Sequence, residues 1–256
     1  MRQDNQFIEM NREEFLHWIM GLKINRKIAH IQNHHTWEPN YNNGSDSIQL
    51  SKNMKNYHVN DLGWFDIAQQ FTTVKNGLIC TGRSLEKDPA GIASHNTGGI
   101  CIENVGNFDI NGDTMTTEHL KTIVFLNAVL CLKFGLDVSV DTIVYHTWFS
   151  NLNEANKKTC PGTNFFKGNT KQSAINNFYP LINQEILEIK KSLIGEVINM
   201  FNDEDKIAGW AKSSVDKLAN LGLIKGDNNG NVNPENPITR QEFCVVIDRL
   251  LALLGK

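Results

Sequence analysis

Histidines and one cysteine occur where strands are expected to end or where the chain turns, and these are places from which side chains do chemistry. His34 and His35 are adjacent in "NHHTW", His146 lies in "VYHTW", and Cys160 lies in "KKTCPG". Two imidazoles and a thiolate are donors that Zn²⁺ favours in a tetrahedral shell. Three protein ligands would leave a fourth position for water, as in catalytic zinc sites. For Cys160 the alternatives are a disulfide, a thiol nucleophile or an inert turn residue.

The cysteine pattern favours a metal ligand over a disulfide. The chain has five cysteines, an odd number with wide spacing and no Cys-x-x-Cys pair, which argues against a disulfide framework. Four of them lie in apolar patterns and are expected to be small buried residues: Cys80, Cys101, Cys131 and Cys244. Only Cys160 lies in a polar segment rich in turn residues.

Glu103 is a candidate catalytic residue. It lies within "GICIENV", an apolar run that is typical of a buried strand. A carboxylate is costly to bury in such a strand unless it is paired or used. The alternative is a partly solvated glutamate at a strand end. Side chains alternate along a strand, so His34 and His35 are expected to point in opposite directions and only one of them to bind a metal.

The elements that would position these residues predict an α/β fold with a mixed central sheet flanked by helices, over residues 1–195. The Asn11 and Glu14 pair has capping-box spacing and predicts a helix after it. An Asn76-Gly77 turn between extended segments predicts a hairpin. The other expected elements are strands around 27–37, 98–108 and 141–148, a helix from Thr117 to Phe134 stopped by Gly135, and a helix over 181–194.

The tail, residues 196–256, is expected to be a small all-α module with two helices around a loop rich in Gly, Asn and Pro. Thr239 and Glu242 have the spacing of a capping box at the start of the last helix. An apolar stripe follows in that helix: Phe243, Val246, Ile247, Leu250, Leu251 and Leu254. A core this small is marginal alone, so the module is expected to pack on something.

The totals exclude several classes of protein. The chain has 256 residues, 40% apolar and 21% charged, which fits a soluble globular protein. A net charge of −3 argues against nucleic-acid binding, and no apolar run reaches the ~20 residues of a membrane helix. The first residues lack the apolar core of a signal peptide, so we expect synthesis in the cytoplasm.

Two segments begin like calcium loops, "DINGDTMTTEHL" from Asp109 and "DNNGNVNPENPI" from Asp227. Both lack glycine at the sixth position and glutamate at the twelfth, which an EF-hand uses. We interpret both as Asn/Asp/Gly turns.

Five segments in a fixed order resemble one family: "NHHTW", "DIAQQFTTVKNGLICTGRS", "NTGGICIENVGNF", "VYHTW" and "KKTCPG". Together, over about residues 25–185, they are similar to the zinc-dependent N-acetylmuramoyl-L-alanine amidases, the family shared by bacteriophage lytic amidases and peptidoglycan recognition proteins. The resemblance implies that His34, His146 and Cys160 bind Zn²⁺. His35 matches the neighbour that is not a ligand.

The resemblance also implies roles for four further residues. Glu103 matches a glutamate beside the metal, where it takes a proton from water and delivers it to the departing amine. Lys158 matches a lysine of some phage members and would stabilise an oxyanion; the alternative is a solvated loop lysine. Gln69, in "AQQF", stands where many relatives have a catalytic tyrosine, so this chain departs from that mechanism. The role left is an amide hydrogen bond to substrate, from Gln69 or Gln70. Asn96 matches an asparagine position that borders the cleft.

The tail resembles a single S-layer homology repeat, on "FND", "WAKSSVDKLANLGLIKGDNNGNVNPENPITRQEF" and its "ITRQE" segment. Such repeats usually occur in threes and bind anionic secondary polymers of Gram-positive walls. The resemblance therefore implies a wall-polymer partner, or association of chains into a homo-oligomer through the tail. Trp210 and Arg240 are the candidate wall-binding residues. The alternatives are core packing for Trp210 and a surface role at the helix start for Arg240.

The resulting expectation is a zinc-dependent peptidoglycan hydrolase that cleaves the amide between N-acetylmuramic acid and L-alanine. Because no export signal is evident, a phage or prophage endolysin that reaches the wall after release is the expected role, with an autolysin as the nearest variant. Two alternatives stay open: a peptidoglycan recognition protein without catalysis, and a cysteine hydrolase that uses Cys160 with a histidine.

Overall fold

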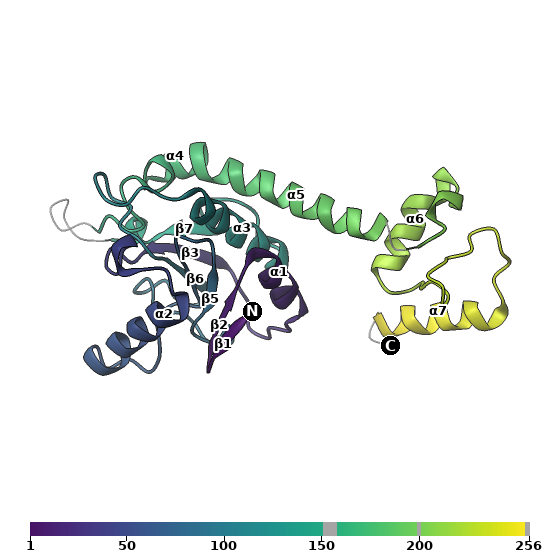
Figure 1. Ribbon diagram of the computed structural model, residues 1–256, viewed down its shortest axis with the longest axis horizontal. Coiled ribbons are helices and arrows are strands. Elements are labelled where there is room, and N and C mark those ends of the chain that lie inside the picture. The colour runs from purple at the N-terminus through teal and green to yellow at the C-terminus, as the bar shows by residue number, and fades with distance from the viewer. Residues whose placement is uncertain (151–157, 199–200, 254–256) are drawn as a thin grey trace. The chain divides into compact units, whose positions relative to one another are not determined.

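The computed structural model describes residues 1–150, 158–198 and 201–253 and divides the chain into two compact units, Met1–Ile186 and Leu187–Lys256 (Figure 1). The division falls inside helix α5 (Tyr179–Ile198). The predicted boundary at 195/196 lies farther along that helix. Because the division between the two units falls within one continuous helix, no linker segment marks it in the sequence.

The first unit is built on a seven-stranded mixed sheet in the order β1-β2-β5-β4-β6-β3-β7. The strands β4, β6, β3 and β7 are parallel to one another, and the pairs β1/β2, β2/β5 and β5/β4 are antiparallel. The predicted fold class is confirmed. The strand bounds are β1 Arg2–Asp4, β2 Phe7–Met10, β3 His30–His35, β4 Phe71–Thr73, β5 Ile79–Thr81, β6 Gly99–Asn104 and β7 Ile143–Tyr145.

Three helices have the bounds α1 Arg12–Gly21, α2 Ser47–Asn56 and α3 Thr117–Phe134. The capping box of Asn11 and Glu14 is present at the start of α1, as predicted. Helix α3 has the predicted bounds and ends at Gly135, whose φ of 65° is the left-handed conformation that glycine adopts readily. A short α4 (Lys171–Ser173) precedes α5.

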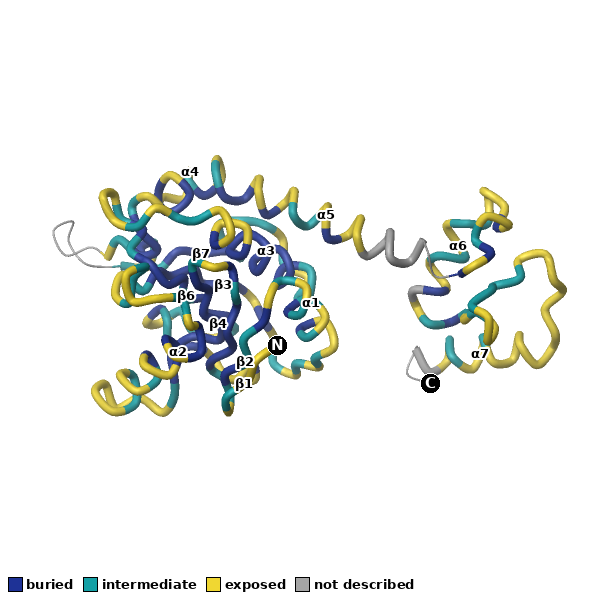
Figure 2. Tube along the Cα trace, in the orientation of Figure 1, coloured by how far each residue is buried: buried dark blue, intermediate teal, exposed yellow. Residues whose placement is uncertain are grey.

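Helices α3 and α2 cover opposite faces of the sheet, and the strands β3, β4, β5, β6 and β7 are buried almost throughout, whereas β1 is largely exposed (Figure 2). On one face, Asn33 of β3 exchanges amide hydrogen bonds of 2.9 and 3.1 Å with Asn127 of α3. On the other face, Ser51 of α2 donates to Thr72 of β4 at 3.2 Å. Thr72 is registered with Glu103, so α2 covers the face of the sheet on which Glu103 lies.

The second unit contains α6 (Gly209–Asn220) and α7 (Arg240–Leu253). Its small core consists of Phe201, Ile207 and Ala219 with partly buried neighbours. The predicted capping box is present at α7, where Thr239 and Glu242 exchange hydrogen bonds. The apolar stripe of α7 is largely exposed at three positions, Phe243, Ile247 and Leu251; Leu254 lies outside the described residues.

Membrane-spanning helices are absent from the part of the chain that the structure describes, since none of its helices is both long and apolar enough.

Candidate metal centre and active site

The parallel strands bring the candidate residues to one edge of the sheet. His34 is the partner of Glu103 in the parallel register of β3 with β6. On the other side of β3, Asn33 is the partner of Tyr145, which is the last residue of β7 and directly precedes His146. Because the carboxyl ends of parallel strands meet at one edge, residues far apart in sequence are adjacent here.

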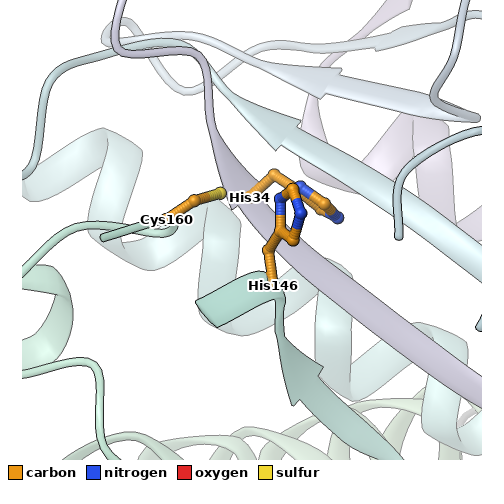
Figure 3. Close-up of side chains that lie close together, drawn as sticks. All are labelled: His34, His146 and Cys160. Atoms are coloured by element: carbon orange, nitrogen blue, oxygen red, sulfur yellow. The ribbon is translucent and has the colours of Figure 1, made fainter. Parts of the chain in front are cut away.

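His34, His146 and Cys160 point toward one another at this edge (Figure 3). One ligand atom from each lies within 4.8 Å of the others, and the rings of His34 and His146 have centroids 4.7 Å apart. The predicted ligand set therefore comes together in space. Two nitrogens and one sulfur at this spacing fit the donor preference of Zn²⁺.

The loop that carries Cys160 is held by hydrogen bonds from both sides. Asp109 accepts from the backbone N–H of Thr163 at 2.9 Å and from the Thr159 hydroxyl at 3.0 Å. The carbonyl of Cys160 accepts from the N–H of Thr147 at 2.8 Å, next to His146. Asp109 begins a segment that resembles a calcium loop, but its carboxylate accepts hydrogen bonds that stabilise the loop of Cys160.

His35 has a separate role, as the alternation of side chains predicts. Its Nδ1 accepts a hydrogen bond from the backbone N–H of Phe108 at 3.1 Å. Its own backbone N–H points at the sulfur of Cys160, 3.4 Å away. Such a donor stabilises a thiolate.

Glu103 lies beside the metal donors. Its Oε1 is 3.8 Å from Nδ1 of His34, and the side chain is only 17% exposed. Its Oε2 is buried without a hydrogen-bond partner among the described residues. Burial raises the pKa of Glu103 to about 8, against an opposing effect of the Lys158 charge. The carboxyl group is thus poised to hold or release a proton near neutral pH.

The protonation states of the three donors fit a bound dication. Burial, with a contribution from His146, lowers the pKa of His34 well below 6.5, and burial lowers that of His146 to about 4. Both imidazoles are therefore neutral near pH 7, as metal ligands must be. Burial and the nearby Glu103 raise the pKa of Cys160. A dication bound at this point would place positive charge beside the Cys160 thiolate and the Glu103 carboxylate, and it would therefore stabilise both anions.

A second group of donor atoms shares His34. Sγ of Cys101 and a carboxylate oxygen of Glu103 lie within 4.8 Å of a ring nitrogen of His34. Cys101 lies within β6 and is fully buried, whereas His146 and Cys160 line an open cavity. The set with His146 and Cys160 is therefore the one that a substrate can reach.

The cavity over the donors has a volume of about 470 Å³. Besides the donors, it is lined by Glu103 and Lys158, so two predicted catalytic residues share it. Three aromatic residues that were not predicted also line the cavity: Trp37, His58 and Trp64. Trp37 directly follows the "HHT" segment. Its position in sequence, next to a predicted metal donor, could have indicated that it lines the cavity.

The structure gives Gln69 and Asn96 internal partners instead of a place on this cavity. Gln69 is fully buried, and its amide donates to the hydroxyl of Thr72 at 3.0 Å. Oδ1 of Asn96 accepts from the backbone N–H groups of Gly91 and Ile92 at 3.0 and 2.9 Å. The predicted substrate contact of Gln69 therefore has no support in the geometry, because its amide is enclosed, and Asn96 shapes the loop over the cavity.

In the second unit, Trp210 is 89% exposed, so the alternative of core packing is wrong. Arg240 is exposed at the first position of α7. Their predicted contact with a wall polymer stays a prediction. Asp227 accepts from the N–H groups of Asn229 and Asn231 at 2.8 and 3.0 Å, so this second calcium-like segment is a turn.

Comparison with protein families finds two matches. Residues 24–163 match the family described as N-acetylmuramoyl-L-alanine amidase. Residues 201–244 match the S-layer homology domain. The two matches fall in the first and second units respectively.

The chain is also similar to individual solved structures and to one curated protein. The N-acetylmuramoyl-L-alanine amidase LysC from Clostridium intestinale URNW is 21% identical, with 60% of this chain and 88% of that chain covered and a TM-score of 0.45. Wild-type PGRP-LB of Drosophila is 18% identical, with 63% and 95% covered and a TM-score of 0.47. The Surface-layer 125 kDa protein of Lysinibacillus sphaericus is 44% identical over 52 residues, which are 20% of this chain and 4% of that protein.

Proposed function

Because the chain belongs to the N-acetylmuramoyl-L-alanine amidase family, we propose that it hydrolyses the amide bond between N-acetylmuramic acid and L-alanine in peptidoglycan. The observation that carries this proposal is the meeting of three metal donors and a buried carboxyl group in one open cavity. Peptidoglycan is the substrate that the amidase family implies.

His34, His146 and Cys160 are the residues that would hold Zn²⁺. When bound, the ion would lower the pKa of a water molecule and polarise the substrate carbonyl. The donor set supports this assignment because both imidazoles are neutral near pH 7 and the thiol lies among them. Asp109 and the backbone of Thr147 would keep the sulfur in place, since they fix the loop on both sides.

Glu103 would carry the proton between water and the leaving group. Its pKa of about 8 in the metal-free protein allows it to accept a proton on a carboxylate oxygen and to release it again near neutral pH. Delivery of that proton to the departing amine of L-alanine completes the hydrolysis. Lys158, on the same cavity, would stabilise negative charge on the carbonyl oxygen.

Two alternatives are less well supported. A recognition protein without catalysis would have no need of a buried carboxyl group beside three metal donors, and one oxygen of this carboxyl group has no hydrogen-bond partner among the described residues. A cysteine hydrolase needs a nucleophile with a lowered pKa, whereas burial raises that of Cys160.

The test is digestion of purified Gram-positive peptidoglycan with the zinc-loaded full chain, followed by mass analysis of the products. We expect glycan strands with free lactyl groups and peptides with new L-alanine amino termini. Glu103→Gln should abolish the reaction, and Glu13→Gln, an exposed change on α1, should leave it intact. Cleavage at another bond, or no cleavage by the wild type, would reject the proposal.

For the second unit we propose binding to an anionic secondary wall polymer through Trp210 and Arg240. The S-layer homology match and the exposure of both residues support it. The double variant Trp210→Ala/Arg240→Ala should sediment less with polymer-bearing walls and equally with polymer-free peptidoglycan. Equal sedimentation of wild type and variant with polymer-bearing walls would contradict it.

A further inference from the structure

Two tryptophans line the cavity of the metal donors and remain open to solvent. Trp37 is 59% exposed and Trp64 is 37% exposed. An exposed indole is a large apolar surface that a soluble protein usually buries. Two exposed indoles line one cavity, beside polar residues such as Thr36 and Thr159. This combination indicates a ligand-binding surface.

The backbone of Trp37 holds its side chain in this exposed position. Its φ of 59° is left-handed, a conformation that bulky residues rarely adopt. Two hydrogen bonds fix it there: the N–H of Trp37 donates to the carbonyl of Gly106 at 3.0 Å, and the N–H of Glu38 donates to the carbonyl of Thr36 at 2.7 Å. Strain of this kind persists where the surroundings impose it and often occurs at functional sites.

Trp64 is held by His58. The two rings stack with centroids 4.9 Å apart and an angle of 20° between planes. The N–H of Trp64 donates to the carbonyl of His58 at 2.9 Å, and Nδ1 of His58 accepts from the N–H of Ala68 at 3.2 Å. One face of the indole is thus backed by a fixed ring, so binding on it would order few further rotamers.

We propose that Trp37 and Trp64 form a stacking site for sugar rings of the glycan strand. This inference rests on the proposed function and specifies how the substrate is held. The face of a pyranose presents C–H groups that pack on an indole, while its hydroxyl groups point outward to water or to polar neighbours. An open cavity with two half-exposed indoles and a polar lining suits this chemistry better than it suits an apolar peptide side chain, which would be enclosed.

The kinetic test compares two substrates that contain the same amide bond, a glycan-extended muropeptide and a lactyl-peptide without sugar. The variants in the zinc-loaded full chain are Trp64→Ala and Trp37→Asn, since asparagine tolerates a positive φ. We expect each to raise KM for the glycan-extended substrate about tenfold, or about 1.4 kcal/mol, with kcat and the lactyl-peptide reaction unchanged. Phe65→Ala is the matched control, because Phe65 is exposed next to Trp64 but does not line the cavity.

A binding test decides the inference without catalysis. Peptide-free glycan strands are titrated into wild type and into the Trp37→Asn/Trp64→Ala double variant, with line broadening of the glycan NMR signals as the readout. Zinc content and circular dichroism check that the variants are folded. Binding by the wild type that the double variant loses supports the inference even if no amide is cleaved. Equal binding, or an equal loss of activity on both substrates, would overturn it.

Discussion

Replacement of Glu103 by glutamine tests the electrostatics of the candidate site in the metal-free protein. Burial raises the pKa of Glu103 from 4.5 to about 8, so the folded state holds its proton more tightly than the unfolded chain does. A raised pKa of an acid means that the folded state loses stability as pH rises from about 4.5 to about 8. A glutamine side chain at this position cannot ionise, so the variant should not show this loss.

The magnitude follows from the two pKa values. A difference between 4.5 and about 8 corresponds to an upper limit of about 5 kcal/mol, at 1.36 kcal/mol per pKa unit. The side chain keeps 17% exposure, and water will reduce the penalty, so we expect about 2–4 kcal/mol. At pH 8.5 the metal-free Glu103→Gln variant should be more stable than the wild type by this amount, and at pH 4 the two should be equal.

The assay is urea denaturation of both proteins in a zinc chelator at a series of pH values. The histidines titrate in both proteins, so the difference between the two unfolding free energies isolates Glu103. Activity on peptidoglycan, measured on the zinc-loaded forms, should fall about 100-fold or more in the variant. A difference in stability that does not change between pH 4 and 8.5 would refute the assignment of a buried, proton-holding carboxyl group.

Two further predictions concern the loop that carries Cys160 and a buried histidine. Asp109→Ala should weaken zinc binding in chelator competition, because it removes the hydrogen bonds that hold the Cys160 loop. Unchanged affinity would show that these hydrogen bonds are not needed for the site. Burial lowers the pKa of His119 to about 3, so the unfolding free energy of the wild type should fall as pH drops from 6.5 toward 3. In urea denaturation the His119→Gln variant should show a smaller fall. Equal falls in the two proteins would contradict this prediction.

The sequence showed the types of possible metal donors, and the resemblance to the amidase family assigned His34, His146 and Cys160 among them. Simple geometry explains why two of these donors meet Glu103. His34, Glu103 and His146 each occur at or near the end of an apolar strand, and parallel pairing brings such ends together. Helix α3 was predictable from its apolar spacing and from Gly135, which terminates it.

Other features depend on contacts between segments that are distant in sequence. The strands β1 and β2 have only three and four residues and little apolar alternation, so pairing with β5 decides their structure. Gln69 is buried with its amide hydrogen-bonded to Thr72. The direction of the Thr72 side chain is set by strand pairing in the sheet, so the local sequence does not reveal this contact. The left-handed backbone of Trp37 is fixed by the carbonyl of Gly106, which no local pattern around Trp37 reveals.

The central claim is that zinc held by His34, His146 and Cys160 is required for amide hydrolysis, and a zinc titration of the metal-free chain tests it most directly. New L-alanine amino termini released from peptidoglycan are counted as zinc is added. We predict that activity rises linearly and saturates at about one zinc per chain, as expected for one site with three protein ligands. Cys160→Ala should neither retain zinc nor gain activity. Full activity in the metal-free wild type, or in Cys160→Ala, would contradict the account.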